Sequence, residues 1–257
     1  MANKIKFVFK SDKISEFIER LEDLTKIEDT IKLKIDSDNI LMYSILGGNV
    51  MLAFKNFLLK TDDFFNFDEF DFTLDIIIVN AKKFVKNLNF LTSSDKVTIE
   101  YTYKESNDDD NIMNARSMQV VGGKLKVNWL AGEHYELRDI NKTTLRNNLD
   151  IKKRIWSFKI SQCDFSDVKK LSNINSDRII NINIDNGRVI FSEKAAWELE
   201  IDSIDDDRNS NLMLNKRFLS CITDSKDIEF SIFDNFMLIQ EENSNLMLSF
   251  EQDFSDD

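Results

Sequence analysis

The residue types that most often do chemistry are few in this chain, and their spacing does not suit an active site. His134 is the only histidine, so a Ser-His-Asp triad could form only through it, and no nucleophile motif accompanies it. The glycines fall in turns, without a Gly-rich loop ahead of a helix, and no Cys or His set suits zinc. We therefore interpret His134 as a surface residue and predict a protein that is not an enzyme and that needs no cofactor or metal.

Two acidic runs remain as candidates for a metal site, Asp108-Asp109-Asp110 and Asp205-Asp206-Asp207. Carboxylates bind Mg²⁺ and Ca²⁺, but neither run has the spacing of a calcium loop, and each lies between two predicted elements. We interpret both runs as solvated hairpins. An acidic metal-dependent enzyme is the weakest of the functional alternatives.

The basic residues of the predicted helices are more informative. Lys82, Lys83 and Lys86 lie on one helix without an acidic residue among them. The net charges of the four predicted helices are −2 for residues 12–27, +3 for 80–92, 0 for 161–174 and +1 for 213–225. The whole chain carries −12, so the remainder carries −14. The helices are thus less acidic than the rest, although ordinary solvated helix faces would explain the same distribution.

Composition limits the protein class. The chain has 257 residues, of which 42% are hydrophobic and 31% charged, and this favours two modest globular domains. No apolar run is long enough to span a bilayer, and the first residues do not form a secretory signal. Cys163 and Cys221 are interpreted as reduced thiols, so we expect a cytoplasmic protein without membrane contact. The negative charge argues against simple wrapping by nucleic acid but leaves room for one basic inner surface.

One order of elements occurs twice along the chain. The stretch from Trp156 to Ser192 predicts a strand, a helix, a strand, a hairpin turn at Asp185-Asn186-Gly187 and a further strand. About 150 residues earlier, Ile5, Phe7 and Phe9 alternate ahead of a helical stripe and a second strand pair. A repeat of this length indicates two copies of one α+β domain. Further strands are predicted near residues 39–46, 49–55, 74–79, 96–104, 111–121, 124–130, 195–202, 227–232, 235–241 and 245–251, and residues 57–72 as loop with a short strand.

Domain boundaries follow from where this pattern weakens. Residues 132–153 have little periodicity and are the best candidate for a connector between domains. We therefore predict a first domain over residues 1–135, a connector over 136–154 and a second domain over 155–257, each domain with two helices against antiparallel sheets.

This arrangement resembles the DNA sliding clamps, and most of all the two-domain processivity factor of T4-like bacteriophages, which is related in fold to the proliferating cell nuclear antigen. The resemblance rests on the repeated element order, on lysines along the helices and on segments such as IMNARSMQVV and LMLSFEQDFSDD. It implies a ring of three two-domain subunits with the helices inside and the sheets outside. Lysine suits such a lining, because a flexible point charge holds phosphates without reading bases.

The resemblance also implies three sets of site residues. The set expected to face DNA is Lys13, Arg20, Lys82, Lys83, Lys86, Lys169, Lys170, Lys216 and Arg217. The acidic residues of helix 12–27 depart from the family pattern and put the DNA contact of that helix in doubt. The subunit interface would use two edge strands with Lys124, Val127, Trp129, Trp197, Leu199 and Ile201. A pocket for partner peptides would use Ile45, Val50, Leu52, Leu145, Leu149 and Phe250. Simple strand core would explain most of the last two sets as well.

The functional expectation is a homotrimeric sliding clamp of a viral replication system, in the cytoplasm of the host cell. It would encircle duplex DNA without sequence preference, tether the replicative DNA polymerase, and be opened by an ATP-dependent clamp loader. By resemblance it could also tether late-transcription factors. Two alternatives stay open: a monomeric processivity factor that holds DNA by charge alone, and an acidic β-rich interaction protein unrelated to DNA.

Overall fold

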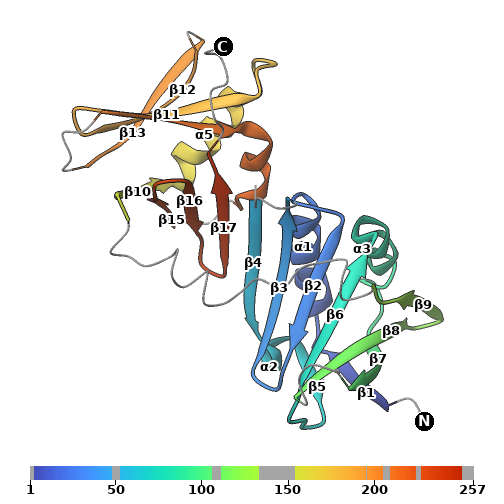
Figure 1. Ribbon diagram of the computed structural model, residues 1–257. Coiled ribbons are helices and arrows are strands. Elements are labelled where there is room, and N and C mark those ends of the chain that lie inside the picture. The colour runs from blue at the N-terminus through green and yellow to red at the C-terminus, as the bar shows by residue number, and fades with distance from the viewer. Residues whose placement is uncertain are drawn as a thin grey trace. The chain divides into compact units, whose positions relative to one another are not determined.

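The computed structural model describes residues 3–47, 53–105, 111–132, 154–194, 196–204, 209–223 and 227–250 (Figure 1). Two compact units are present. Unit 1 comprises residues 1–46 and 55–139, and unit 2 comprises residues 47–54 and 140–257. The predicted connector over residues 136–154 lies almost wholly outside the described residues, so its boundaries stay a prediction.

Unit 1 is built on one twisted sheet. Its strands are β1 (Asn3–Phe9), β2 (Thr30–Ile35), β3 (Asn39–Leu46), β4 (Ala53–Lys60), β5 (Phe65–Phe67), β6 (Thr73–Val79), β7 (Val97–Glu105), β8 (Ile112–Gly122) and β9 (Leu125–Leu130). The order across the sheet is β4-β3-β2-β6-β8-β7-β1-β5, and β9 adds to the second half of β8. β6 and β8 pair in parallel, whereas β7 and β9 both run antiparallel to β8.

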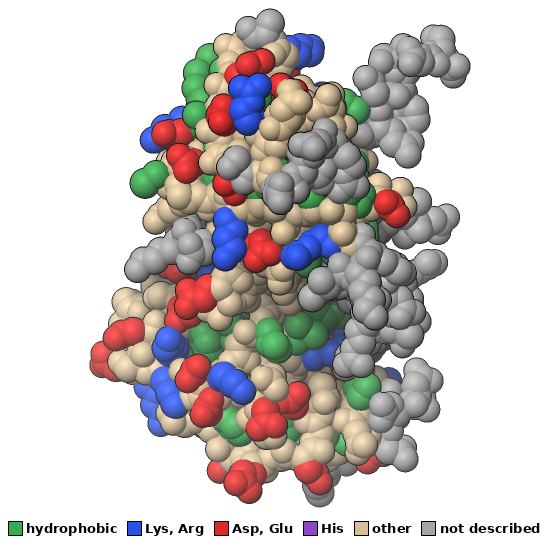
Figure 2. All heavy atoms as spheres, turned by 90° about the vertical axis from the view of Figure 1, so that its left-hand side faces the viewer, with side chains coloured by type: hydrophobic (Ala, Val, Ile, Leu, Met, Phe, Trp, Pro, Cys, Tyr) green, Lys and Arg blue, Asp and Glu red, His purple; other side chains and the backbone are tan. Residues whose placement is uncertain are grey.

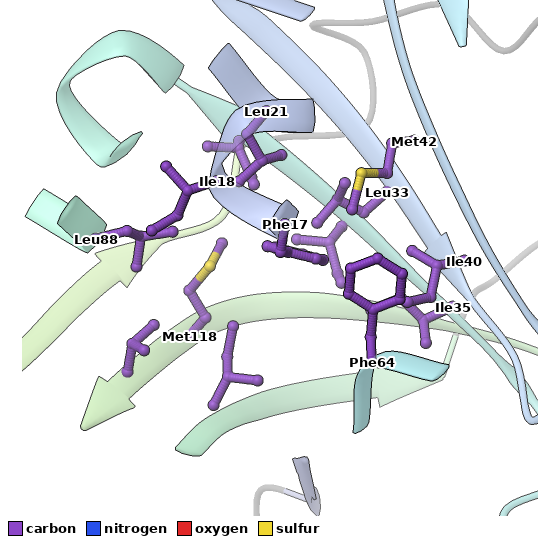
Figure 3. Packing of buried hydrophobic residues seen from close by; sticks show 14 of the residues in the cluster. Phe17, Ile18, Leu21, Leu33, Ile35, Ile40, Met42, Phe64, Leu88 and Met118 are labelled. Atoms are coloured by element: carbon purple, nitrogen blue, oxygen red, sulfur yellow. The ribbon is translucent and has the colours of Figure 1, made fainter. Parts of the chain in front are cut away.

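Two helices, α1 (Lys13–Thr25) and α3 (Ala81–Asn89), pack against each other on one face of this sheet (Figure 1). The apolar stripe predicted for α1 is buried, and Figure 3 shows Phe17 of this helix beside Leu33, and Ile18 on the side of Leu88 of α3, within one cluster. Full burial of one such side chain is worth about 1.5–3 kcal/mol. The apolar residues that recur every 3.6 positions in the helix therefore pack against those that recur every 2 positions in the strands, and together they form one core.

Unit 2 contains two smaller sheets. Its elements are β10 (Trp156–Ser161), α5 (Gln162–Ser172), β11 (Ile179–Asp185), β12 (Arg188–Glu193), β13 (Trp197–Ser203), β14 (Ser210–Asn215), the 3₁₀ helix η2 (Lys216–Cys221), β15 (Asp227–Ile232), β16 (Phe236–Gln240) and β17 (Ser244–Ser249). One sheet has the order β10-β15-β16-β17 and the other β13-β12-β11-β14. The aromatic rings of Phe158 and Phe230 stack at 4.8 Å, and with Phe165 and Phe191 they form the buried centre of the unit.

The repeat found in the sequence is confirmed. β1-α1-β2-β3 in unit 1 and β10-α5-β11-β12 in unit 2 have the same order, with the hairpin turn of the second copy at Asn186 and Gly187, both at positive φ. Asn and Gly tolerate this left-handed conformation, as the turn signal requires. The predicted α+β class with repeated helix-on-sheet domains is therefore confirmed.

Two local predictions were wrong. The helix expected over residues 213–225 is only the short 3₁₀ helix η2, because Met213 and Leu214 pair with β11 as the end of β14, a long-range contact that local periodicity does not reveal. Residues 57–72 were expected to form a loop with a short strand. The short strand is present as β5, but β4 continues to Lys60 and a single helical turn, α2 (Thr61–Phe64), follows it. Buried Phe57 and Leu59 hold this end of β4 in the sheet.

Candidate nucleic-acid interface

Helix α3 presents an uninterrupted basic face. Ala81, Phe84, Val85 and Leu88 are buried against the core, so the helix fixes Lys82, Lys83 and Lys86 on the opposite, exposed side. None of the three lysines forms an ion pair within the described residues. The three-lysine group predicted from the sequence is therefore assembled as one solvent-facing patch with a charge of +3.

The start of α3 opposes the usual electrostatics of a helix. The positive end of a helix dipole favours acidic residues, yet the first turn of α3 contains no acid and carries Lys82 and Lys83. Asn80, which precedes the helix, lies in the left-handed region at φ 51°, and its side chain makes no capping hydrogen bond. Asp29 supplies the cap, because its carboxylate accepts from the Lys82 amide at 2.7 Å and its carbonyl accepts from the Ala81 amide. The cap comes from the loop before β2, so adjacent sequence gave no signal for it.

Helix α1 presents a mixed face beside α3. Glu16 lies between Lys13 and Arg20, at 2.7 Å from Lys13 Nζ and 3.6 Å from an Arg20 guanidinium nitrogen. The hydrogen bond that Lys13 donates to Glu16, together with the negative charge of Glu16, raises the pKa of Lys13 above its ordinary value. Glu19 and Glu22 are exposed on the same helix. The two cations predicted to face DNA are thus partly neutralised, in keeping with the doubt that the sequence raised about this helix.

The basic residues of α5 divide into one exposed and one anchored lysine. Lys170 is exposed, and its ammonium group lies 2.8 Å from Asp167, which raises the Lys170 pKa through a hydrogen bond and its charge. Lys169 is half-buried over the Phe165 ring and donates to the Ile222 carbonyl at 2.8 Å. The Lys169 side chain therefore joins α5 to the end of η2.

Lys216 and Arg217 are neighbours with different surroundings. The Lys216 ammonium group donates to the carbonyls of Ser172 and Asn175, each at 2.5 Å, and lies 3.6 Å from a carboxylate oxygen of the buried Glu193. Lys216 thus neutralises the negative end of α5 and a buried acid. Arg217 is exposed and rests over the Phe218 ring. Sequence reasoning treated the two cations alike, but only Arg217 extends to solvent.

The two strands expected to form a subunit interface are both sheet edges. β9 pairs with β8, and β13 pairs with β12, and neither has a second neighbour among the described strands. Val127 and Trp129 of β9 are half-buried, and the Trp129 ring lies 5.3 Å from Phe84. Trp197, Leu199 and Ile201 of β13 are half-buried as well. Lys124 is exposed in the turn before β9.

Most of the predicted peptide pocket falls outside the described residues, namely Val50, Leu52, Leu145 and Leu149. The two remaining members, Ile45 at the end of β3 and Phe250 after β17, are half-buried. His134 and the runs 108–110 and 205–207 also lie outside the described residues.

Other surface features give little sign of a separate site. In the described part of the chain, no group of three or more His, Cys, Asp or Glu residues could hold a metal ion, and no helix is long and apolar enough to cross a membrane. Cys163 is exposed and Cys221 buried, both as free thiols. The face drawn in Figure 2 mixes basic and acidic side chains without a continuous patch of either sign. The basic face of α3 is therefore the clearest candidate interface.

No protein-family model matches the chain, and no curated protein matches its sequence. Solved structures do match. Proliferating cellular nuclear antigen from Entamoeba histolytica superimposes with a TM-score of 0.67 at 13% identity, covering 98% of this chain and 100% of that one.

Bacterial DNA polymerase III beta subunits match equally well. The protein from Borrelia burgdorferi gives a TM-score of 0.68 at 10% identity and 97% coverage of this chain. The beta clamp of Helicobacter pylori, bound to a DNA ligase peptide, gives 0.68 at 11% identity and 98% coverage. The chain spans 66% of the length of these two proteins. At such low identity the likeness establishes the fold alone, and that fold is the one shared by DNA sliding clamps.

Proposed function

We propose that this chain is a subunit of a DNA sliding clamp, a ring that encircles duplex DNA and tethers a replicative DNA polymerase. The observation that carries the proposal is the basic face of α3 within a clamp fold that extends over nearly the whole chain. A clamp must hold the duplex and still slide, so diffuse contacts between lysines and phosphates suit it better than base contacts. Lys82, Lys83 and Lys86 meet that requirement, since they are exposed and unpaired within the described residues.

The remaining basic residues have graded roles in this proposal. Lys170 and Arg217 are exposed and would add to the DNA-facing charge, while Lys13 and Arg20 share Glu16 and would contribute less. Lys169 and Lys216 would act mainly within unit 2, because their ammonium groups are bonded to backbone carbonyls.

The assembly and partners are proposed from the family resemblance. Three copies would close into a ring through β9 and β13, and an ATP-dependent loader would open this ring. The protein would serve a T4-like bacteriophage in the cytoplasm of the host cell. Late-transcription factors could also bind it there. A complex of PCNA2 with PCNA3 from Sulfolobus tokodaii has the same fold, which supports assembly between such chains. The Helicobacter pylori beta clamp binds a DNA ligase peptide, and a peptide pocket here would include Ile45 and Phe250.

The test separates a closed ring from binding by charge alone. The protein is placed on a nicked circular plasmid with the cognate loader and ATP, and the complex is isolated at 50 mM and at 500 mM salt, before and after the plasmid is cut to a linear form. A topologically linked ring stays on the circle at high salt and is lost when the DNA is cut, because salt does not screen linkage. Equal loss from circular and linear DNA at high salt would identify a monomeric processivity factor. No binding at either salt would favour an interaction protein unrelated to DNA.

A further inference from the structure

The basic face of α3 ends in an exposed phenylalanine. Phe90, the residue that follows α3, is 73% exposed, whereas Phe84 on the same helix is 1% exposed. The Phe90 backbone has φ −69° and ψ −12°, so it continues the helical course of α3. Within the described part of the chain, no aromatic ring or cation is paired with the Phe90 ring. A single exposed apolar side chain is ordinary on a protein surface, so the argument for a role depends on where Phe90 lies relative to the charges.

Helical geometry places Phe90 within the basic face and not beside it. Successive residues of a helix turn by about 100°, so Lys82, Lys86, Phe90 and Lys83 follow one another within a sector of about 100°. The buried residues of α3, together with Leu91, project on the opposite side. Phe90 therefore lies on the part of the helix farthest from the core, where the amphipathic pattern favours a polar residue.

The spacing along this face suits a ligand that alternates between anionic and aromatic groups. Lys82 and Phe90 are about 12 Å apart along the helix axis, with Lys86 midway between them. Residues four positions apart on a helix have Cβ atoms about 5–6 Å apart, so one ligand can reach both Lys86 and Phe90. A single DNA strand offers a phosphate and an unpaired base within each nucleotide, whereas a duplex keeps its bases stacked inside the two rows of phosphates.

Helix α5 provides a comparison within the same chain. Ile174 follows exposed Lys170 by four positions and is 70% exposed, so a lysine also precedes an exposed apolar residue at this helix end. An aliphatic side chain lacks the planar ring on which a base stacks, and Lys170 is paired with Asp167 at 2.8 Å. Of these two helix ends, only that of α3 combines an aromatic ring with a lysine that has no acidic partner among the described residues.

We propose that Phe90 and the three lysines of α3 form a subsite for single-stranded DNA, in which the Phe90 ring stacks on an unpaired base while the lysines hold the neighbouring phosphates. The inference rests on the proposed function, in that it takes the basic face of α3 as the DNA-facing surface. Its new content is that this surface distinguishes unpaired from paired DNA. The subsite tolerates any sequence, because every base has a face on which an aromatic ring can stack. It would act where the duplex ends and the template strand continues unpaired.

The test compares two strands of equal length and charge by fluorescence anisotropy of the full chain at low salt. One is an oligothymidine of about 12 nucleotides, within the range of known single-strand sites, and the other is an abasic strand that keeps the phosphates but lacks the bases. Wild type should bind the oligothymidine more tightly by roughly 5- to 150-fold, the range spanned by stacking of one base. F90A should bind the two strands alike. F90L should also lose the preference, because it is apolar without a ring, whereas F90W should keep it.

Two controls accompany these variants. I174A removes an exposed apolar side chain from the end of α5 and should keep the wild-type preference for oligothymidine. F90A should bind a duplex like wild type and should unfold in urea like wild type, because most of the Phe90 side chain is exposed.

The outcomes separate this inference from the proposed function. Equal binding of the two strands by wild type, a preference that F90A retains, or an equal loss of duplex binding in F90A would overturn the Phe90 subsite. If K82Q/K83Q/K86Q loses duplex affinity in that case, only this inference fails. If that variant binds the duplex like wild type, the assignment of α3 to the DNA-facing surface fails as well.

Discussion

Neutralising the basic face of α3 should separate DNA binding from folding. The change is K82Q/K83Q/K86Q, which removes three positive charges and keeps side chains of similar length and helix propensity. All three positions are exposed, and the buried residues of α3 are other ones, namely Ala81, Phe84, Val85 and Leu88. A defect in this variant would therefore report on the charge itself.

The size of the binding effect follows from counterion release. The slope of log K against log salt is negative, and each lost phosphate contact reduces its magnitude by about 0.9. The loss of three contacts should therefore reduce the magnitude of the slope by about 2.7 per subunit. The weakening should be largest at low salt and should not depend on DNA sequence, because lysines on a helix face contact phosphates and not base edges.

Stability should change little and could rise. Lys82 and Lys83 lie in the first turn of α3, where a positive charge opposes the helix dipole, whereas Lys86 lies in the last turn, where it is favourable. Each interaction is worth about 0.3–1 kcal/mol, so the free energy of unfolding should change by no more than about 1 kcal/mol. The proposed contact of Lys82 and Lys83 with phosphates would explain why two unfavourable lysines lie at one helix start.

The assay is fluorescence anisotropy of a labelled duplex between 50 and 200 mM salt, with urea unfolding of the same samples. The matched control is K60Q/K104Q/K159Q, which removes three exposed lysines from strands of the two units. An unchanged salt slope for the α3 variant, or an equal reduction in the control, would refute the assignment of α3 to the DNA-facing surface.

Three further predictions concern stability and are measured by urea unfolding. K216M should lower the free energy of unfolding by about 3–5 kcal/mol, because buried Glu193 loses its cation. R217Q, at the neighbouring exposed position, should change the free energy of unfolding by less than about 0.5 kcal/mol. Similar values for the two variants would contradict the different roles assigned to Lys216 and Arg217. D29A should cost about 0.5–2 kcal/mol through the lost cap of α3, and a smaller effect would mean that water replaces it. F17A should cost about 3–5 kcal/mol at the core of unit 1.

Local sequence patterns were sufficient for most elements. The α1 stripe, the alternation of Ile180, Ile182 and Ile184, and the turn at Asn186 and Gly187 all predicted what the structure contains. These signals arise within a few residues, because side-chain periodicity and turn conformation are local properties. The repeat order then indicated the fold class, which the structural comparisons confirmed.

Only the tertiary structure decided which basic side chains remain available. Lys216 was grouped with Arg217 by sequence, but its partners at Ser172 and Glu193 come from elements brought together by folding. The same holds for Lys169, whose bond to Ile222 spans 53 positions along the chain. The sequence determined the helices and strands through short-range periodicity, whereas the environment of each charge depends on long-range contacts that periodicity does not encode.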